Sequence, residues 1–416
     1  MPLSKRYAQT VVVLTFVVFT AFFHSISMRD SWRGSPQRIG LGKTPGLSPP
    51  PASGRIGDSS YIEETQGPEP YSAQSIFHPG NVKAPGSNYS HVVVVPRMQE
   101  DDIGWMKKEL SDIEFIVYAA DDPKALLHPP KNKGHEVMIY LTYIIDHYSN
   151  LPDIVLFMHA HRWTHHNNEL LGFDAVQMIP AVSFERVTRE GYMNLRCQWD
   201  PGCPEWLFPG NPEETLKKQE EPYVAKAWEE IHPFDPVPHV LAQPCCAQFA
   251  VSKERIRSIP LQRFVFYRDW MLRTPLSDYV SGRIWEYTWQ FVFTGQTTLC
   301  PAEHVCYCDG FGVCFGGQAQ YNEYFELQRK KRESHKELDK WLSKMAAIEE
   351  AQIRYGAERA ASLEVPERGR DVYLKDRIAA LERELEKRVI DAKERGRNPQ
   401  ARAEEAGREW KDGDGF

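Results

Sequence analysis

The chain has 416 residues, of which 42% are hydrophobic, so it is long enough for one sizeable domain with appended segments or for two small domains. A net charge of −7 argues against nucleic acid as the main partner. Eight cysteines are too few for a fold built mainly on disulfides, although their clustering calls for an explanation.

An uncharged stretch covers residues 7–28, directly after two basic residues. Its centre, Val11–Phe23, is almost entirely apolar, and a helix of about 20 residues spans a bilayer. The basic charges place the short tail, residues 1–6, in the cytosol. A cleaved signal peptide is the alternative, but residues 24–27 match a cleavage site poorly. We therefore expect a single-pass signal anchor with the remaining chain in the lumen.

Residues 29–90 are rich in proline, glycine and serine and show no hydrophobic periodicity. A segment of this composition cannot bury a core, so we expect an extended, disordered linker. Asn88 begins an N-glycosylation sequon just before the predicted domain, where a lumenal glycan would be tolerated.

The folded domain is expected at residues 91–318. Short apolar, partly β-branched runs alternate here with helical spacing, which is typical of crossover helices between parallel strands. The sequence therefore predicts an α/β fold with a mostly parallel sheet. Its first elements are expected as strands at 91–95, 113–118 and 153–158 and helices at 101–110 and 136–148.

The third predicted strand leads directly into a histidine cluster: four of the 14 histidines lie at positions 159, 161, 165 and 166. Ligands of open α/β sheets bind beyond the carboxyl ends of the strands. Because side chains alternate along a strand, His159 and His161 would share one side, as a catalytic pair or as ligands of a divalent metal. The alternative is a capped strand followed by solvated loop histidines. The spacing matches no tight zinc motif.

A glycine-containing turn with two lysines precedes the helix at 136–148. Free N–H groups at a helix start favour a phosphate, so Asn132, Lys133, Gly134 and Glu136 are candidate binding residues. An ordinary exposed turn with solvated lysines explains the same pattern.

Later elements are expected as helices at 170–178, 223–231, 263–273 and 277–293, and as strands at 240–252, with Ser252 capping a short helix through 259. Glu286 lies in an aromatic run within the helix at 277–293. A buried carboxylate has a raised pKa, which suits a general acid or base. A glutamate on the solvent face of the helix is the alternative.

Four cysteines follow one another in a glycine-rich segment, 299–317, which we expect to be a loop. Their spacing lacks the paired knuckles of zinc sites, so two disulfides within Cys300, Cys306, Cys308 and Cys314 are expected in an oxidising lumen. Cys197 and Cys203 could form a third. The adjacent Cys245 and Cys246 could pair elsewhere or remain buried thiols.

Residues 319–416 change in composition, with lysine, arginine and glutamate dominating. Apolar residues follow heptad-like spacing for about two heptads in each of two segments, which is short for a coiled coil. We expect two charged, mostly solvated helices, with self-association through them as the alternative.

Several blocks together resemble a fungal family defined by a domain of unknown function, number 3431. They are KNKGHE with the helix YLTYIIDHYSNLPD, the strand ending FMHAH, and the segments CCAQFAVS, WEYTWQFVF and CPAEHVCYCDGFGVC. The resemblance covers about residues 91–317.

A weaker resemblance, carried by the Asn-Lys-Gly-x-Glu helix start and the strand ending in a polar triplet, is to glycosyltransferases of the GT-A type, including rhamnan-synthesis transferases. It implies a nucleotide-sugar donor and a triplet that binds metal and diphosphate. His159-Ala160-His161 replaces the usual Asp-x-Asp, which puts metal dependence in doubt. Arg162 and the turn lysines would then neutralise the diphosphate, and Glu286 is implied as catalytic base.

The sequence thus predicts a membrane-anchored Golgi or ER protein that transfers a sugar to a glycan or glycoprotein acceptor. One alternative is a non-catalytic lumenal binding or assembly protein with a transferase-like fold. Another is a metal-dependent hydrolase built on the histidine cluster.

Overall fold

The computed structural model describes residues 77–416, with residues 214 and 216 excepted. The predicted signal anchor at 7–28 and the linker up to residue 76 lie outside this range. Within the range, no helix combines the length and the apolar character needed to cross a membrane.

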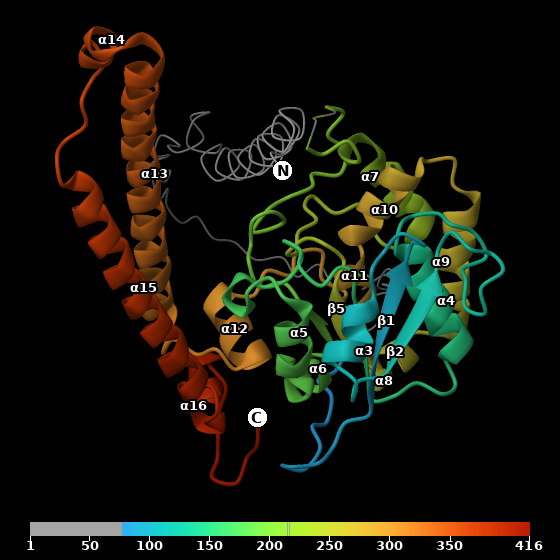
Figure 1. The fold of residues 1–416 in the computed structure, drawn as a ribbon. Coiled ribbons are helices and arrows are strands. Elements are labelled where there is room, and N and C mark those ends of the chain that lie inside the picture. The colour runs from blue at the N-terminus through green and yellow to red at the C-terminus, as the bar shows by residue number, and fades with distance from the viewer. Residues whose placement is uncertain (1–76, 214, 216) are drawn as a thin grey trace, which may run out of the picture. The chain divides into compact units, whose positions relative to one another are not determined.

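A five-stranded sheet lies at the centre of the domain (Figure 1). Its order is β2-β1-β3-β5-β4, in which β1 runs parallel to β2 and β3, and β5 runs antiparallel to both β3 and β4. This confirms the predicted α/β class with a mostly parallel sheet. The strands are β1 (His91–Arg97), β2 (Phe115–Ala119), β3 (Ile154–Phe157), β4 (Tyr192–Asn194) and β5 (Phe249–Ser252).

Helices cover both faces of the sheet, which explains why its strands are apolar without interruption. Val92 and Val94 of β1 belong to one hydrophobic cluster and Val93 and Val95 to another on the opposite face. The first face is covered by α4 (Val137–His147), α7 (Glu221–Ile231), α9 (Leu261–Arg273), α10 (Asp278–Glu286) and α11 (Trp289–Thr294). The second is covered by α3 (Gly104–Glu109), α5 (Ala175–Met178), α6 (Phe184–Glu190) and α12 (Glu303–Phe311). Three short elements complete the domain: η1 (Glu169–Leu171), η2 (Ile179–Ala181) and α8 (Lys253–Arg257).

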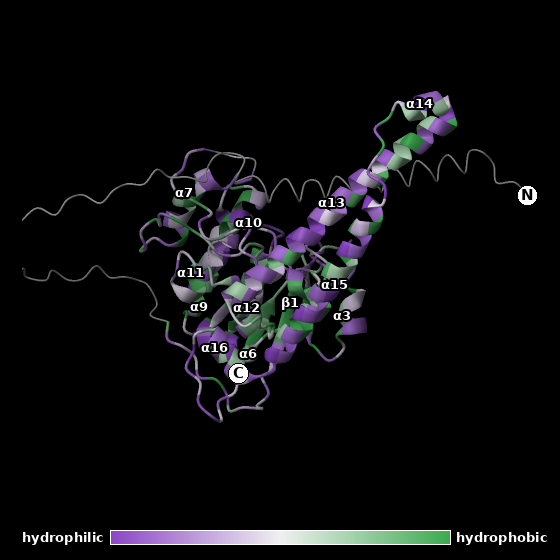
Figure 2. Cartoon of the chain, turned by 90° about the vertical axis from the view of Figure 1, so that its left-hand side faces the viewer, coloured by the Kyte–Doolittle hydropathy of each residue, from purple (hydrophilic) through white to green (hydrophobic). Residues whose placement is uncertain are grey.

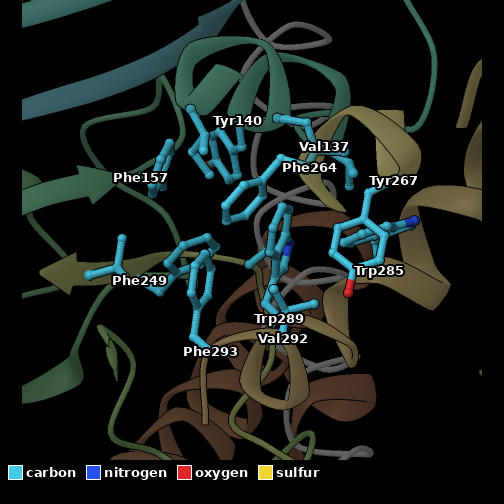
Figure 3. Close-up of a cluster of buried hydrophobic side chains, with 14 of the residues drawn as sticks. Val137, Tyr140, Phe157, Phe249, Phe264, Tyr267, Trp285, Trp289, Val292 and Phe293 are labelled. Atoms are coloured by element: carbon cyan, nitrogen blue, oxygen red, sulfur yellow. The ribbon is translucent and has the colours of Figure 1, made fainter. Parts of the chain in front are cut away.

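Aromatic side chains fill the core of the first face (Figure 3). The ring of Phe157, the last residue of β3, lies 4.7 Å from that of Tyr140 and 5.0 Å from that of Phe249, between ring centroids. Phe249 in turn contacts Trp289 at 5.1 Å. Such contacts add about 0.5–1.5 kcal/mol per pair beyond burial. This cluster therefore fixes the end of β3 and the start of β5 against α4 and α11.

Several predicted boundaries differ from the structure. The helix expected at 277–293 is interrupted at 287–288, and Gly295 ends its second part in the left-handed conformation at φ 71°. The helix expected at 170–178 is divided by Gly172 into η1 and α5. The cysteine segment 299–317, expected as a loop, contains α12. Sequence patterns gave no sign of α6 or of β4, which has only three residues.

All eight cysteines are paired, but mostly not as predicted. Cys308–Cys314 lies within the cysteine segment, whereas two other disulfides connect that segment to the loop after β4. The expected Cys197–Cys203 pair is therefore wrong. Cys245 and Cys246 bond to each other. The pairs are Cys197–Cys306, Cys203–Cys300, Cys308–Cys314 and Cys245–Cys246.

The last part of the expected linker, 77–90, forms neither helix nor strand but is held against the domain. Asp153, just before β3, accepts hydrogen bonds from Lys83 Nζ at 2.7 Å and from the backbone N–H of Ser90 at 2.9 Å. The Asn88 sequon lies between these anchors and is exposed.

The charged C-terminal segment forms a helical arm, α13 (Gln318–Tyr355) and α15 (Arg370–Arg395), whose helices pack against each other (Figure 1). Figure 2 shows that the arm is mostly hydrophilic, whereas the sheet is hydrophobic. α14 (Ala357–Ala361) joins the two helices, and α16 (Pro399–Glu405) returns to α12.

The return is fixed by Asp309 of α12, whose carboxylate accepts from Arg189 at 3.0 Å and Arg408 at 2.8 Å. Arg402 of α16 also donates to the Asp309 carbonyl at 2.7 Å.

Candidate functional site

The ends of β1, β3 and β4, the start of β5 and the ends of two helices lie on one side of the sheet. β3 ends at Phe157, and β5, which runs in the opposite direction, begins beside it at Phe249. The parallel strands β1 and β4 end on the same side, as do the start of α4 and the end of α10. We call this group of side chains the carboxyl-edge site: Glu136, His159, Arg196, Cys245, Cys246 and Glu286.

Glu286 is buried, with 7% of its surface exposed, which excludes the solvent-facing alternative. Its Oε1 accepts from the backbone N–H of Cys246 at 2.5 Å, and its Oε2 accepts from Arg283 at 2.9 Å. Burial raises the pKa of Glu286, and the Arg283 guanidinium opposes part of that rise. Because both oxygens have partners inside the protein, Glu286 primarily ties the cysteine turn to α10.

Glu136 is the less constrained of the two carboxyl groups. It is half-buried at the start of α4, and burial raises its pKa to about 8, with further contributions from the nearby charges of Glu286 and Asp278. In the described part of the chain, no other residue donates a hydrogen bond to its carboxyl oxygens. A carboxyl group that titrates near neutral pH is suited to general acid or base work.

His159 follows β3 and is held at its backbone, where its N–H donates to Gln248 Oε1 at 3.0 Å. Burial lowers the pKa of His159 to about 4, and the charge of His161 lowers it further, so its imidazole is neutral near pH 7. Its Nε2 is buried and has no hydrogen-bond partner among the described residues. The ring can therefore accept a proton or a hydrogen bond from a ligand.

His161, the expected partner of His159, has a different surrounding. Its side chain is 67% exposed, and its Nε2 lies 3.4 Å from Asp101 Oδ1, beyond the end of β1. Among the described residues, neither His159 nor His161 belongs to a set of three or more His, Cys, Asp or Glu side chains whose donor atoms lie within 4.8 Å of one another. A metal ion bound by His159 and His161 would thus have no third protein ligand already close to both histidines in the described part of the chain.

The predicted phosphate-binding cations also have internal partners. Arg162 forms a two-point ion pair with Asp174, at 2.9 and 3.1 Å, and stacks on Trp163. Lys133 is buried and donates to the Thr274 carbonyl.

The N–H of Gly134 donates to Asp278 Oδ1 at 2.5 Å. Asp278 thus occupies the position at this turn where a phosphate was expected. Asn132 is exposed at the same turn. A side chain at Gly134 would meet Met271 Sδ at 2.5 Å, which explains the glycine with φ +73°.

Sequence patterns gave no sign of Arg97, the last residue of β1. The chain passes from β1 to β2 on one side, while β3 lies on the other, so the strand order reverses between β1 and β3. Ligands of α/β sheets bind at such a point. The Nε atom of Arg97 is buried there and has no partner among the described residues. The one local cue was a cation two residues after the β-branched run 92–95, which by itself indicates no ligand site.

The family model described as "Protein of unknown function (DUF3431)" matches residues 93–309, just over half of the chain. The chain belongs to the DUF3431 family. No curated protein and no solved structure matches it. The DUF3431 match includes the whole carboxyl-edge site and ends within α12, before the helical arm begins.

Proposed function

We propose that this DUF3431 protein is a glycosyltransferase-like enzyme that transfers a sugar from a nucleotide sugar at the carboxyl-edge site. The observation that carries the proposal is the position of Glu136. It is a carboxyl group at the start of α4 whose pKa burial raises to about 8, and the buried carboxyl of Glu286 lies nearby.

In the proposed reaction, Glu136 in its ionised form takes the proton from an acceptor hydroxyl. The hydroxyl oxygen attacks the anomeric carbon of the donor, and the bond from that carbon to the diphosphate breaks. The nucleoside diphosphate leaves with the bonding electrons. Glu286 is a positioning residue in this scheme, because it fixes the cysteine turn that contacts His159.

The leaving diphosphate requires a positive charge. Arg97 is assigned this role, because Arg162 and Lys133 already have internal partners. The triplet after β3 contains histidines instead of aspartates, so the proposed reaction assigns no step to a divalent metal. Donor binding is measured with and without Mn²⁺ for this reason.

A thermal-shift panel tests donor binding. The full chain is mixed with nucleotide sugars carrying uridine, guanosine or thymidine, with and without Mn²⁺. A ligand at 100 times its Kd stabilises the fold by about 2.7 kcal/mol, which raises the melting temperature measurably. His159→Ala and Arg97→Ala are expected to lose the shift, whereas Arg354→Ala on the helical arm keeps it. No shift with any nucleotide sugar contradicts the proposal.

A non-catalytic binding or assembly protein with this fold is the second candidate. The internal partners of Arg162, Lys133 and Glu286 favour it, because structural charges are usually paired in this way. It predicts that Glu136→Gln leaves the cellular phenotype unchanged, whereas deletion of residues 321–416 abolishes it. Self-association through the helical arm belongs to this candidate and is measured by sedimentation of the full chain and the deletion variant.

We further propose that residues 7–28 anchor the chain in the Golgi or ER membrane with the domain in the lumen. Four disulfides and an exposed Asn88 sequon support this, because disulfides persist in oxidising compartments. A glycosidase-sensitive mass that Asn88→Gln removes is the expected result. A chain that bears no glycan and is digested by protease outside sealed vesicles contradicts this topology.

A further inference from the structure

The disulfide between Cys245 and Cys246 joins neighbouring residues, unlike the other three disulfides. It encloses no further residue, whereas Cys197–Cys306 spans a sequence separation of 109. The entropic stabilisation from closing a loop grows with the length of the loop, so this pair gains least from it. The residues around it are also in unusual backbone conformations, with φ +91° at Cys246 and +47° at Ala247.

Metal-ligand side chains surround this disulfide. The donor atoms of His165, His166 and Cys246 all lie within 4.8 Å of one another. In a tetrahedral zinc site with bonds of about 2.0–2.3 Å, neighbouring donors are roughly 3.3–3.8 Å apart. The three side chains thus need only a small adjustment to reach one ion.

The two imidazoles are held in place by their backbone. The His165 carbonyl accepts from Arg196 Nε and the His166 carbonyl accepts from Gln248 Nε2, both at 3.2 Å. The Nδ1 atom of His166 is buried and has no hydrogen-bond partner among the described residues.

A guanidinium group lies beside the other sulfur. Arg196 Nη1 is 3.3 Å from Cys245 Sγ, in a buried position. A neighbouring cation stabilises a thiolate, and a stabilised thiolate leaves faster in thiol–disulfide exchange. Cys245 is therefore the expected leaving group, and Cys246 the sulfur that is attacked.

We propose that reduction of the Cys245–Cys246 disulfide by a dithiol opens a Zn²⁺ site whose protein ligands are His165, His166 and Cys246, with water in the fourth position. One thiolate of the dithiol attacks Cys246 Sγ, and Cys245 leaves as a thiolate. The second thiol of the reductant then displaces Cys246. The reductant ends as a disulfide, and its two protons end on the two cysteines. Zinc binding releases the proton of Cys246 to water.

The experiment measures zinc binding by the full chain before and after treatment with limiting dithiothreitol, with Zn²⁺ alone as the probe and a chromogenic chelator as competitor. Alkylation and mass spectrometry identify which cysteines are free. We expect about one additional Zn²⁺ per chain once Cys245 and Cys246 are both free, and none at this position in the oxidised chain.

The variant His165→Ala/His166→Ala tests the site without changing any disulfide, and it is expected to lose the additional zinc. His161→Ala, an exposed histidine of the same loop, is the matched control and keeps it. Equal zinc binding by the double variant and the wild type overturns the proposal, as does a chain that has both cysteines free but binds no zinc. Circular dichroism spectra that match the wild type establish that the double variant is folded.

Discussion

The carboxyl-edge site and the helical arm use charged residues in opposite ways. On the arm, Arg329 pairs with Glu326 and Glu333, and these side chains are about half exposed. In the site, Glu286 is buried, and Glu136 and His159 are half-buried with few or no side-chain partners. Exposed pairs such as those of the arm contribute about 0–1 kcal/mol each, whereas buried groups shift their pKa values strongly.

This contrast indicates where chemistry is to be expected. The charged side chains of the arm lie at the surface and pair with one another along a long helix pair. The carboxyl-edge site retains groups whose burial costs free energy, and such groups concentrate at functional sites. The contrast can be tested by comparing a substitution in the domain with a matched substitution in the helical arm.

The largest effect on stability is expected in the aromatic core beneath the site. Phe249→Ala removes a side chain with no exposed surface and should lower the free energy of unfolding by about 3–5 kcal/mol. On the arm, Leu342 is 43% exposed, and Leu342→Ala should change it by less than about 0.5 kcal/mol. Denaturant unfolding of both variants measures the difference, and similar losses would show that the arm has a core of its own.

Asp309 tests a charge buried between the domain and the end of the arm. Burial raises its pKa, but the guanidinium groups around it, above all that of Arg189, outweigh this and hold the pKa below its usual range. Asp309→Asn leaves these cations uncompensated and should cost about 3–5 kcal/mol. Glu333→Gln, which breaks an exposed pair, should cost about 0–1 kcal/mol. The free energy of unfolding, measured as a function of pH, provides a check. The stabilisation by the Asp309 carboxylate is complete above pH about 4 and is lost below it, as the pH falls through the lowered pKa.

His232 gives a pH effect of intermediate size. Burial lowers its pKa to about 3, so below pH 6.5 the unfolded chain binds the proton and the folded chain does not. Stability should therefore fall as the pH decreases from about 6.5 to 3, by up to about 1.4 kcal/mol per pH unit for this one group. His232→Phe should reduce that slope, and Leu342→Ala on the arm, which changes no titratable group, should leave it unchanged. A slope that is the same in all three chains refutes the assignment.

The smallest effect is expected from the ion pairs along α13. Arg329→Ala removes contacts to Glu326 and Glu333 and should lower the free energy of unfolding by about 0.5 kcal/mol, with a smaller loss at high salt. A loss of unfolding free energy above about 2 kcal/mol that does not change with salt would show that these exposed ion pairs stabilise the arm as strongly as buried charges stabilise the domain.

The sequence was informative where a pattern is long and local. β1, β3 and α4 each carry a continuous apolar run or a clear helical period, and all three lie close to where they were expected. The Ser252 cap was also predicted, and its side chain accepts from the N–H of Arg255. The direction of β5 was not predicted, because an apolar run does not distinguish a parallel from an antiparallel neighbour.

The site was harder to predict because its contacts join distant segments. His159 and Glu286 were found from local cues, but the pKa of Glu136 is raised first by its burial in the folded domain and then by the charges of Glu286 and Asp278 on α10, which lie far away in the sequence. The disulfides show the same limit, since Cys306 pairs with Cys197 rather than with a neighbour in its own segment. Arg97 became a candidate only when the order of the strands was known.

The most direct measurement is the turnover of the donor that binds best, comparing the wild-type chain with Glu136→Gln and with Glu333→Gln as the matched change on the arm. We expect that Glu136→Gln still binds the donor but lowers kcat by about 10²–10⁴-fold, and that the wild-type rate rises with pH up to about 8 as Glu136 ionises. A Glu136→Gln variant that turns over the donor at the wild-type rate would contradict this expectation.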